Sequence, residues 1–103
     1  MIVRFKTQYL QKLFEQGEIS GKPKYNEEVL QKFRKTVLKL QYADNILDIK
    51  SLKSLNFEAL KGKVKGLYSV RVDLKYRLLF RIEKDGIIAE GIILIEELSN
   101  HYQ

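Results

Sequence analysis

Residues 60–80 read LKGKVKGLYSVRVDLKYRLLF, which has the pattern of a β-hairpin. Apolar and polar side chains alternate along residues 67–72 and again along residues 76–83, and this period of two is typical of a half-buried strand. Both apolar sets can share a face only if the loop between them has an odd length, as Asp73-Leu74-Lys75 has. The face predicted to meet the core then carries Tyr68, Val70, Val72, Tyr76, Leu78, Phe80 and Ile82.

The other face of this hairpin places Arg71 directly opposite Arg77. Like charges in opposed positions destabilise a sheet unless an anion lies between them. Because neither arginine has an obvious partner in the sequence, the pair favours a phosphate site. The structural alternative is an ion pair with an acidic residue: Asp73, Glu96 or Glu97.

A second hairpin is predicted to follow. Asp85-Gly86 is typical of a two-residue type I′ turn, and residues 87–95 then form a near-continuous apolar strand. This register pairs Arg81 with Glu90, so Arg81 is interpreted as structural. Adjacent strand residues point to opposite faces, so Glu96-Glu97 is not expected to act as a pair of catalytic carboxylates.

The chain before the hairpins predicts one strand and two helices. Residues 1–6 alternate as a short strand, and Thr7 is a good N-cap for a short helix that ends at Gly17. A longer helix is expected to begin near Tyr25-Asn26 and to fade near Tyr42-Ala43. The predicted order is β-α-α-β-β-β, an α+β fold in which two N-terminal helices pack on a small antiparallel sheet.

The longer helix is predicted to have one buried side. Its apolar stripe consists of Val29, Leu30, Phe33, Val37 and Leu40. Three lysines lie off this stripe and are expected to be solvated: Lys32, Lys35 and Lys39.

Composition restricts the classes of function. The 103 residues are expected to form one domain, residues 1–103, and 45% hydrophobic content suffices for one modest core. The net charge of +6 favours an acidic partner such as nucleic acid, although solubility alone is the alternative. With no cysteine and a single histidine, thiolate chemistry and multi-histidine metal sites are excluded. No apolar run is long enough to span a bilayer, so a soluble, cytoplasmic protein is expected.

Three pieces of residues 60–80 together resemble the core signature of HigB-type toxins, which belong to the RelE/ParE superfamily. The pieces are Leu60-Lys61-Gly62, the strand Gly66-Leu67-Tyr68-Ser69-Val70-Arg71-Val72, and the return Tyr76-Arg77-Leu78-Leu79-Phe80. The upstream order of strand, two helices and connector also resembles the family, so the resemblance covers most of the chain. It implies two helices packed on an antiparallel sheet.

The resemblance also implies an activity and partners. HigB-type toxins cleave mRNA, typically on translating ribosomes, and are neutralised by a cognate antitoxin that is usually a helix-turn-helix protein. This chain is therefore expected to be the endoribonuclease toxin of a type II toxin–antitoxin system and to inhibit translation. It is expected to need no metal or other cofactor and to meet no membrane.

Site residues follow from the resemblance position by position. The family's basic positions near the substrate phosphate correspond to Lys61, Arg71 and Arg77. The family's C-terminal catalytic segment often ends in Asp-Tyr-His, whereas residues 99–103 read SNHYQ, with His101 and Tyr102 in swapped order and no aspartate. His101, Tyr102, Arg77 and Lys61 are accordingly the expected catalytic residues.

The residue types suit metal-free RNA cleavage. Such a reaction needs a base for the 2′-hydroxyl proton, cations for the charge on the phosphate and an acid for the leaving 5′-oxygen. Histidine suits either proton role near neutral pH, so His101 could take one and Tyr102 or a lysine the other. Guanidinium groups match phosphate oxygens, and an alternating run is expected to line the RNA path: Lys61, Lys63 and Lys65.

Each assignment has a structural alternative. His101 lies near the end of the sequence, where chains usually fray. The lysine run is also typical of a solvated edge that prevents strand-to-strand aggregation. Tyr68 and Tyr76 fall on the core face, so packing is favoured over stacking on an RNA base.

Two other functions remain open at this level. One is a ParE-like toxin that inhibits DNA gyrase and cleaves no RNA. The other is a non-enzymatic basic module that binds RNA or protein. The combination of His101-Tyr102 with Arg71 and Arg77 favours the endoribonuclease.

Overall fold

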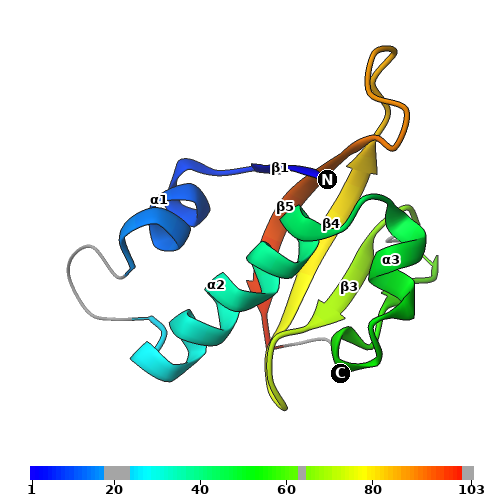
Figure 1. Ribbon diagram of the computed structural model, residues 1–103. Coiled ribbons are helices and arrows are strands. Elements are labelled where there is room, and N and C mark those ends of the chain that lie inside the picture. The colour runs from blue at the N-terminus through cyan, green and yellow to red at the C-terminus, as the bar shows by residue number, and fades with distance from the viewer. Residues whose placement is uncertain (18–23, 63–64, 101–103) are drawn as a thin grey trace.

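The computed structural model describes residues 1–17, 24–62 and 65–100. Its elements are, in order, β1 (Ile2–Phe5), α1 (Gln8–Gln16), α2 (Glu27–Tyr42), α3 (Ile46–Ser51), the 3₁₀ turn η1 (Lys53–Leu55), β2 (Glu58–Ala59), β3 (Tyr68–Arg71), β4 (Arg77–Glu83) and β5 (Ile92–Ser99). The strands form one sheet in the order β1-β5-β4-β3-β2, and the helices cover one of its faces (Figure 1). The predicted α+β class is confirmed. The sheet is mixed rather than wholly antiparallel, because β1 pairs in parallel with β5.

Helices α1 and α2 begin where the sequence indicates, because a side chain caps each one. The Thr7 hydroxyl accepts a hydrogen bond from the backbone N–H of Leu10, and the Asn26 side chain accepts one from Val29 at 2.8 Å. These bonds satisfy N–H groups that the first turn of a helix leaves without a partner. The end of α1 is held to α2 by Arg34, whose Nε donates to the carbonyl of Phe14 at 3.1 Å.

The core lies between α2 and the sheet. The whole predicted stripe of α2 is buried, and Phe33, Val37 and Leu40 have no exposed surface. The sheet side of the core consists of Val70, Leu78, Phe80, Ile93, Ile95 and Leu98. Burial of these aliphatic and aromatic side chains is the main stabilisation that a domain of this size has available.

The β3–β4 hairpin has the predicted register. Arg71 lies opposite Arg77 and Tyr68 lies opposite Phe80, so Tyr68, Val70, Leu78 and Phe80 share the face that meets the helices. The side chain of Asp73 closes the intervening turn by accepting hydrogen bonds from the N–H groups of Lys75 and Tyr76 at 2.8 and 2.7 Å. An aspartate at this place stabilises a turn by substituting for backbone acceptors.

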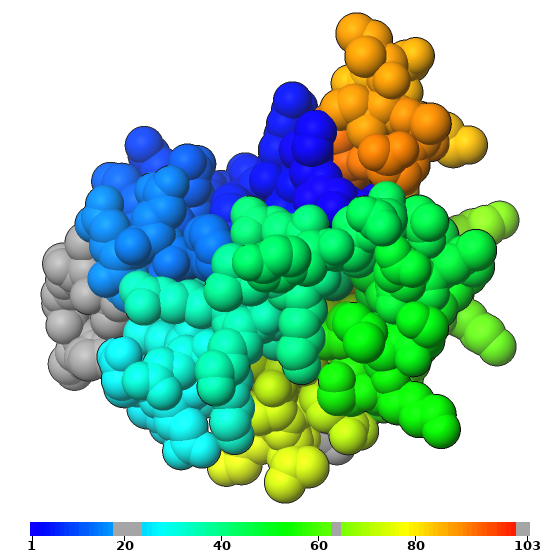
Figure 2. All heavy atoms as spheres, in the orientation of Figure 1, coloured from blue at the N-terminus to red at the C-terminus, as the bar shows by residue number. Residues whose placement is uncertain are grey.

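The predicted register of the β4–β5 hairpin is wrong. Strand β5 begins at Ile92 rather than near Ile87, and Ile92 pairs with Glu83. Residues 84–91 form a loop that stands clear of the rest of the surface (Figure 2), with Ile87 94% exposed. The Asp85 side chain accepts hydrogen bonds from the N–H groups of Ile87 and Ile88. Those donors are therefore not available to a strand ladder.

The two strands also contain a register shift. Leu79 pairs with Glu97 whereas Phe80 pairs with Ile95. Glu96 is therefore an extra residue in β5 that has no pairing partner in β4. The expectation that Glu96 and Glu97 point to opposite faces is wrong, because this extra residue lets both lie on the face away from the helices.

Arg81 has an acidic partner, although it is not the predicted Glu90. Its Nε lies 2.9 Å from the carboxylate of Glu96, which also lies 3.6 Å from the Lys6 ammonium. Arg81 is thus structural, as interpreted.

None of the helices in the described ranges is long and apolar enough to cross a membrane.

Candidate functional site

A small cleft lies between the β3–β4 turn and the segment from η1 to β2. Its volume is about 100 Å³, and its lining residues are Asn56, Glu58, Arg71, Asp73, Leu74, Lys75 and Arg77. Three of these side chains are cationic and two are acidic. The cleft therefore contains both opposed arginines of the predicted phosphate site.

Arg77 is fixed within the protein. It is only 5% exposed, and its Nε donates to the Ser69 hydroxyl at 2.9 Å. Its Nη2 donates to the carbonyl of Asn56 at 2.5 Å and lies 3.7 Å from the Glu58 carboxylate. The idea that Arg77 lacks a partner is wrong, and the alternative ion pair is made with Glu58 rather than with any of the three acidic residues considered from the sequence.

The surroundings of Arg77 make its positive charge costly. Burial lowers the pKa of Arg77 from its usual value, while the charge of Glu58 raises it and that of Arg71 lowers it. A guanidinium so placed remains charged at neutral pH. Additional negative charge in the cleft would therefore be stabilised by it.

Arg71 differs from Arg77 in having no such anchor. Its side chain is exposed, and within the described part of the chain it makes no hydrogen bond or ion pair. It lies opposite Arg77 in the ladder and lines the same cleft. Arg77 is thus held in position by protein contacts, whereas the exposed side chain of Arg71 can contact an anion that enters the cleft from solvent.

The remaining predicted residues lie elsewhere or outside the described ranges. Lys61 and Lys65 are exposed and flank the start of β3, where the N–H of Leu60 donates to the carbonyl of Leu67 at 2.9 Å. That end of β3 is about 10 Å along the strand from Arg71. The structure therefore does not bring these two lysines into the cleft. Lys63, His101 and Tyr102 lie outside the described residues.

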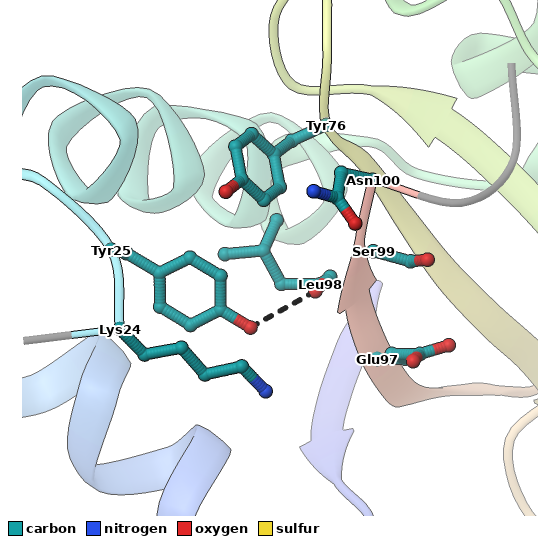
Figure 3. Close-up of a pocket in the computed structure, with 7 residues that line it drawn as sticks. All are labelled: Lys24, Tyr25, Tyr76, Glu97, Leu98, Ser99 and Asn100. Atoms are coloured by element: carbon teal, nitrogen blue, oxygen red, sulfur yellow. Dashed lines mark hydrogen bonds between the residues drawn. The ribbon is translucent and has the colours of Figure 1, made fainter.

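A second pocket lies where β5 ends (Figure 3). It has a volume of about 200 Å³ and is lined by Lys24, Tyr25, Tyr76, Glu97, Leu98, Ser99 and Asn100. Tyr25 donates a hydrogen bond from its hydroxyl to the carbonyl of Leu98 at 3.0 Å, and its ring meets that of Tyr76 edge-on at 5.6 Å.

The end of β5 is close to the arginine cleft in the strand ladder. Ser99 pairs with Arg77, and Asn100 is the next residue. The described chain therefore stops one residue after the pairing partner of Arg77, just before His101 and Tyr102.

The two tyrosines of the core face pack as predicted. Tyr68 stacks on Phe57 with ring centroids 5.3 Å apart, and Tyr76 packs against Tyr25. Both are partly buried against the core. These contacts favour the packing interpretation of both rings.

Two functional candidates were missed from the sequence. Glu58 comes from β2, a two-residue strand that has no periodic pattern and is defined only by its pairing with β3. The lysines of α2 are exposed, as predicted, and they also line a groove of about 300 Å³ together with Thr36, Ser54, Arg71 and Val72. The spacing of residues 32, 35 and 39 places them on one side of the helix and could have indicated this surface.

The described residues contain no cluster of three or more His, Cys, Asp or Glu side chains that could hold a metal ion. The arginine cleft itself presents three cationic side chains, two carboxylates and the amide of Asn56.

Comparisons with known proteins place this fold. The chain resembles the YoeB/ParE toxin from Agrobacterium tumefaciens, with 16% identity, a TM-score of 0.60 and coverage of 99% of this chain and 100% of that one. It also resembles the YoeB–YefM complex from Staphylococcus aureus, with 19% identity, a TM-score of 0.60 and coverage of 99% and 98%. At these identities the likeness concerns the fold. No curated protein sequence matches the chain.

The family assignment comes from the sequence of residues 3–93. These residues match the family model of HigB-like toxins, described as RelE-like toxins of the type II toxin–antitoxin system HigB. The match covers α1, α2 and the β3–β4 hairpin, and it ends at Ile93 near the start of β5. The chain belongs to the HigB-like family of RelE-like type II toxins.

Proposed function

We propose that this toxin is an endoribonuclease that cleaves mRNA on the ribosome and so inhibits translation. The observation that carries the proposal is the arginine pair: Arg77 is fixed by protein contacts, Arg71 lies opposite it without a partner in the described chain, and both line one cleft. This arrangement suits a phosphodiester, because guanidinium groups on two sides can contact its two non-bridging oxygens.

The reaction would use the 2′-hydroxyl of the substrate as nucleophile. Its oxygen bonds to the adjacent phosphorus while a base takes its proton, and the bond to the 5′-oxygen breaks as an acid protonates that oxygen. The products are a 2′,3′-cyclic phosphate and a 5′-hydroxyl end. Arg71 and Arg77 would stabilise the negative charge that grows on the phosphate, which is the largest contribution that fixed cations make to such reactions.

Two kinds of residue could carry the protons. The carboxylate of Glu58 lines the cleft 3.7 Å from Arg77, and this position supports a role as proton acceptor. His101 and Tyr102 follow the strand end that pairs with Arg77, which supports their role toward the leaving oxygen. Lys61, Lys63 and Lys65 would contact RNA outside the cleft.

The proposed partners are mRNA, the ribosome and a cognate helix-turn-helix antitoxin. The Staphylococcus aureus structure of the same fold is a complex of YoeB with YefM, which supports a protein partner for this toxin as well. The cationic cleft suits an acidic segment of the antitoxin as much as RNA, so neutralisation by direct occupation of the cleft is part of the proposal.

The test is purified toxin added to a translation reaction, with the mRNA mapped by primer extension. Discrete cuts with 5′-hydroxyl ends are expected, and they should disappear with Arg71→Ala or His101→Ala and persist with Lys12→Ala, an exposed residue of α1. Intact mRNA combined with inhibition of DNA supercoiling by the wild-type toxin would overturn the endoribonuclease in favour of a ParE-like activity.

A further inference from the structure

A second cationic surface adjoins the arginine cleft. The groove between α2 and the segment of η1 and β3 is lined by Lys32, Lys35, Thr36, Lys39, Ser54, Arg71 and Val72, and its volume is about 300 Å³. In Figure 2 the β3–β4 turn emerges below α2 and the green α3–η1 segment. Arg71 lines both this groove and the smaller cleft, so the two adjoin at this residue.

The lysines of the groove are available for a ligand. Lys35 makes no hydrogen bond or ion pair within the described residues, and Lys39 has only a 3.4 Å hydrogen bond to the Ser54 hydroxyl. Lys32 pairs with Glu28 at 3.2 Å one helical turn away, and both side chains are largely exposed. Such a pair contributes little in water, so a phosphate can replace Glu28 at small cost.

The spacing of the lysines suits a linear anion. Lys32 and Lys39 are separated by about 10 Å along the helix axis, with Lys35 between them. The three ammonium groups can therefore meet more than one phosphate of the same strand. Arg71 continues this row of cations toward Arg77.

The composition of the groove disfavours a folded protein as its occupant. Lysine is depleted in the centres of protein–protein interfaces, which are built around aromatic and aliphatic anchors. Val72 is the only apolar side chain among the residues that line this groove. A surface of lysines without an apolar anchor is typical of sequence-independent contact with a nucleic-acid backbone.

We propose that the α2 groove binds the backbone of the RNA strand that flanks the phosphate held by Arg71 and Arg77. This inference rests on the proposed endoribonuclease, since it extends the substrate path of the same site. The groove contributes affinity without reading bases, because lysines contact phosphates and none of its lining side chains is placed as a base-stacking platform.

The experiment compares two variants with the same change of charge. Lys35→Gln/Lys39→Gln alters the groove, and Lys12→Gln/Lys84→Gln alters two exposed lysines of α1 and the β4–β5 loop. Binding is measured by fluorescence anisotropy with an oligouridylate of about twelve nucleotides that carries 2′-O-methyl groups, so that it cannot be cut. Thermal unfolding of both variants checks that each one folds.

The measured quantity is the slope of log Kd against log salt concentration. Each phosphate contact to a single strand contributes about 0.7 to this slope, so the groove variant should lose about 1.4 and the control should keep the wild-type slope. When salt rises from about 50 to 200 mM, the factor by which affinity falls should then be about sevenfold smaller for the groove variant than for the wild type.

Two outcomes overturn the inference. One is an unchanged slope in the groove variant, which together with weaker binding of an acidic antitoxin peptide would assign the groove to the antitoxin. The other is an equal loss of slope in both variants. Failure of the proposed function is visible separately, as absence of cleavage by the wild-type toxin in the translation reaction. His101→Ala is expected to bind the oligonucleotide with the wild-type slope and to cut nothing.

Discussion

Arg71 and Arg77 show how two residues of the same type, opposed in one ladder, acquire different roles. The Nε and Nη2 atoms of Arg77 are engaged by Ser69, Asn56 and Glu58, whereas Arg71 extends into solvent. A buried guanidinium contributes to folding as well as to binding, because its removal leaves acceptors without a donor. Substitution of Arg77 should therefore lower the stability of the protein, whereas substitution of Arg71 should lower its activity alone.

Arg77→Ala is expected to lower the free energy of unfolding by about 2 kcal/mol, since the Ser69 hydroxyl and the Asn56 carbonyl lose their donor. Arg71→Ala should leave stability nearly unchanged while abolishing cleavage. Urea denaturation and the translation assay measure the two quantities. Equal destabilisation by both substitutions would contradict the anchored role of Arg77.

Glu58→Gln tests the proton acceptor in the cleft. If Glu58 takes the 2′-hydroxyl proton, the rate of cleavage at saturating toxin should fall by at least about 100-fold. Binding of the uncleavable oligonucleotide should be equal or tighter, because one negative charge has gone. A variant that cuts at the wild-type rate would restrict Glu58 to orienting Arg77.

Tyr25→Phe is expected to cost about 1 kcal/mol of stability, because the buried carbonyl of Leu98 loses the hydroxyl that donates to it at 3.0 Å. Tyr42→Phe is the matched control, since the Tyr42 side chain is 85% exposed. Denaturant titration of the two variants side by side provides the measurement. Equal midpoints for both would show that the hydrogen bond to Leu98 adds nothing to stability.

Among the elements, the two hairpins differ in how far the sequence could predict them. The β3–β4 register follows from two local features of the sequence. These are the alternating pattern of each strand and the odd length of the three-residue turn, which keeps the apolar residues on one face. The β4–β5 register depends on the side chain of Asp85 and on the extra residue Glu96. The apolar run of residues 87–89 predicts a strand. Nothing in that run shows that the N–H groups of Ile87 and Ile88 donate to the Asp85 side chain instead of to a neighbouring strand.

The residues of the candidate site also differ in how far the sequence could predict them. Arg71 and Arg77 were predicted because they stand at fixed places on periodic strands. Glu58 was not, because β2 exists only through its pairing with β3. The α2 lysines are exposed as predicted, but the groove beside them is not visible in the sequence, because Ser54 and Arg71, which complete it, are distant from the helix in sequence.

Gly91→Ala is expected to destabilise the β4–β5 hairpin by about 1–2 kcal/mol. Gly91 has φ +85°, and an added Cβ would lie 2.9 Å from the carbonyl oxygen of Glu83. Gly86→Ala is the control in the same loop, because a Cβ there has no neighbour within 4 Å. Urea midpoints compare the two, and an equal loss in both variants would contradict the close approach at Gly91.

At the scale of the whole molecule, β4 is the centre of the sheet and β1 joins it last. Ile2 pairs with Ile92, so the parallel edge of the sheet brings together segments from opposite ends of the sequence. Long-range pairing of this kind is slow to form, because loop closure precedes its stabilising contacts. Strand β4, by contrast, has antiparallel neighbours on both sides.

Native-state hydrogen exchange should therefore be slowest at the amides of Leu78, Leu79 and Phe80, which are buried and paired on both sides. The amides of β1 should exchange faster, through local opening that leaves the antiparallel strands intact. Exchange by NMR at neutral pH measures this order. Protection in β1 equal to that in β4 would indicate that the parallel edge opens only with the whole domain.

The extra residue in β5 gives the family a point at which chain length can vary. Deletion of either Glu96 or Glu97 would restore regular pairing, leave Ile95 opposite Phe80 and keep Ser99 opposite Arg77. Deletion of Ile95 would instead bring a glutamate against Phe80 in the core. A difference of one residue at these glutamates would thus leave Ser99 opposite Arg77, and a one-residue gap in an alignment of related toxins is expected here.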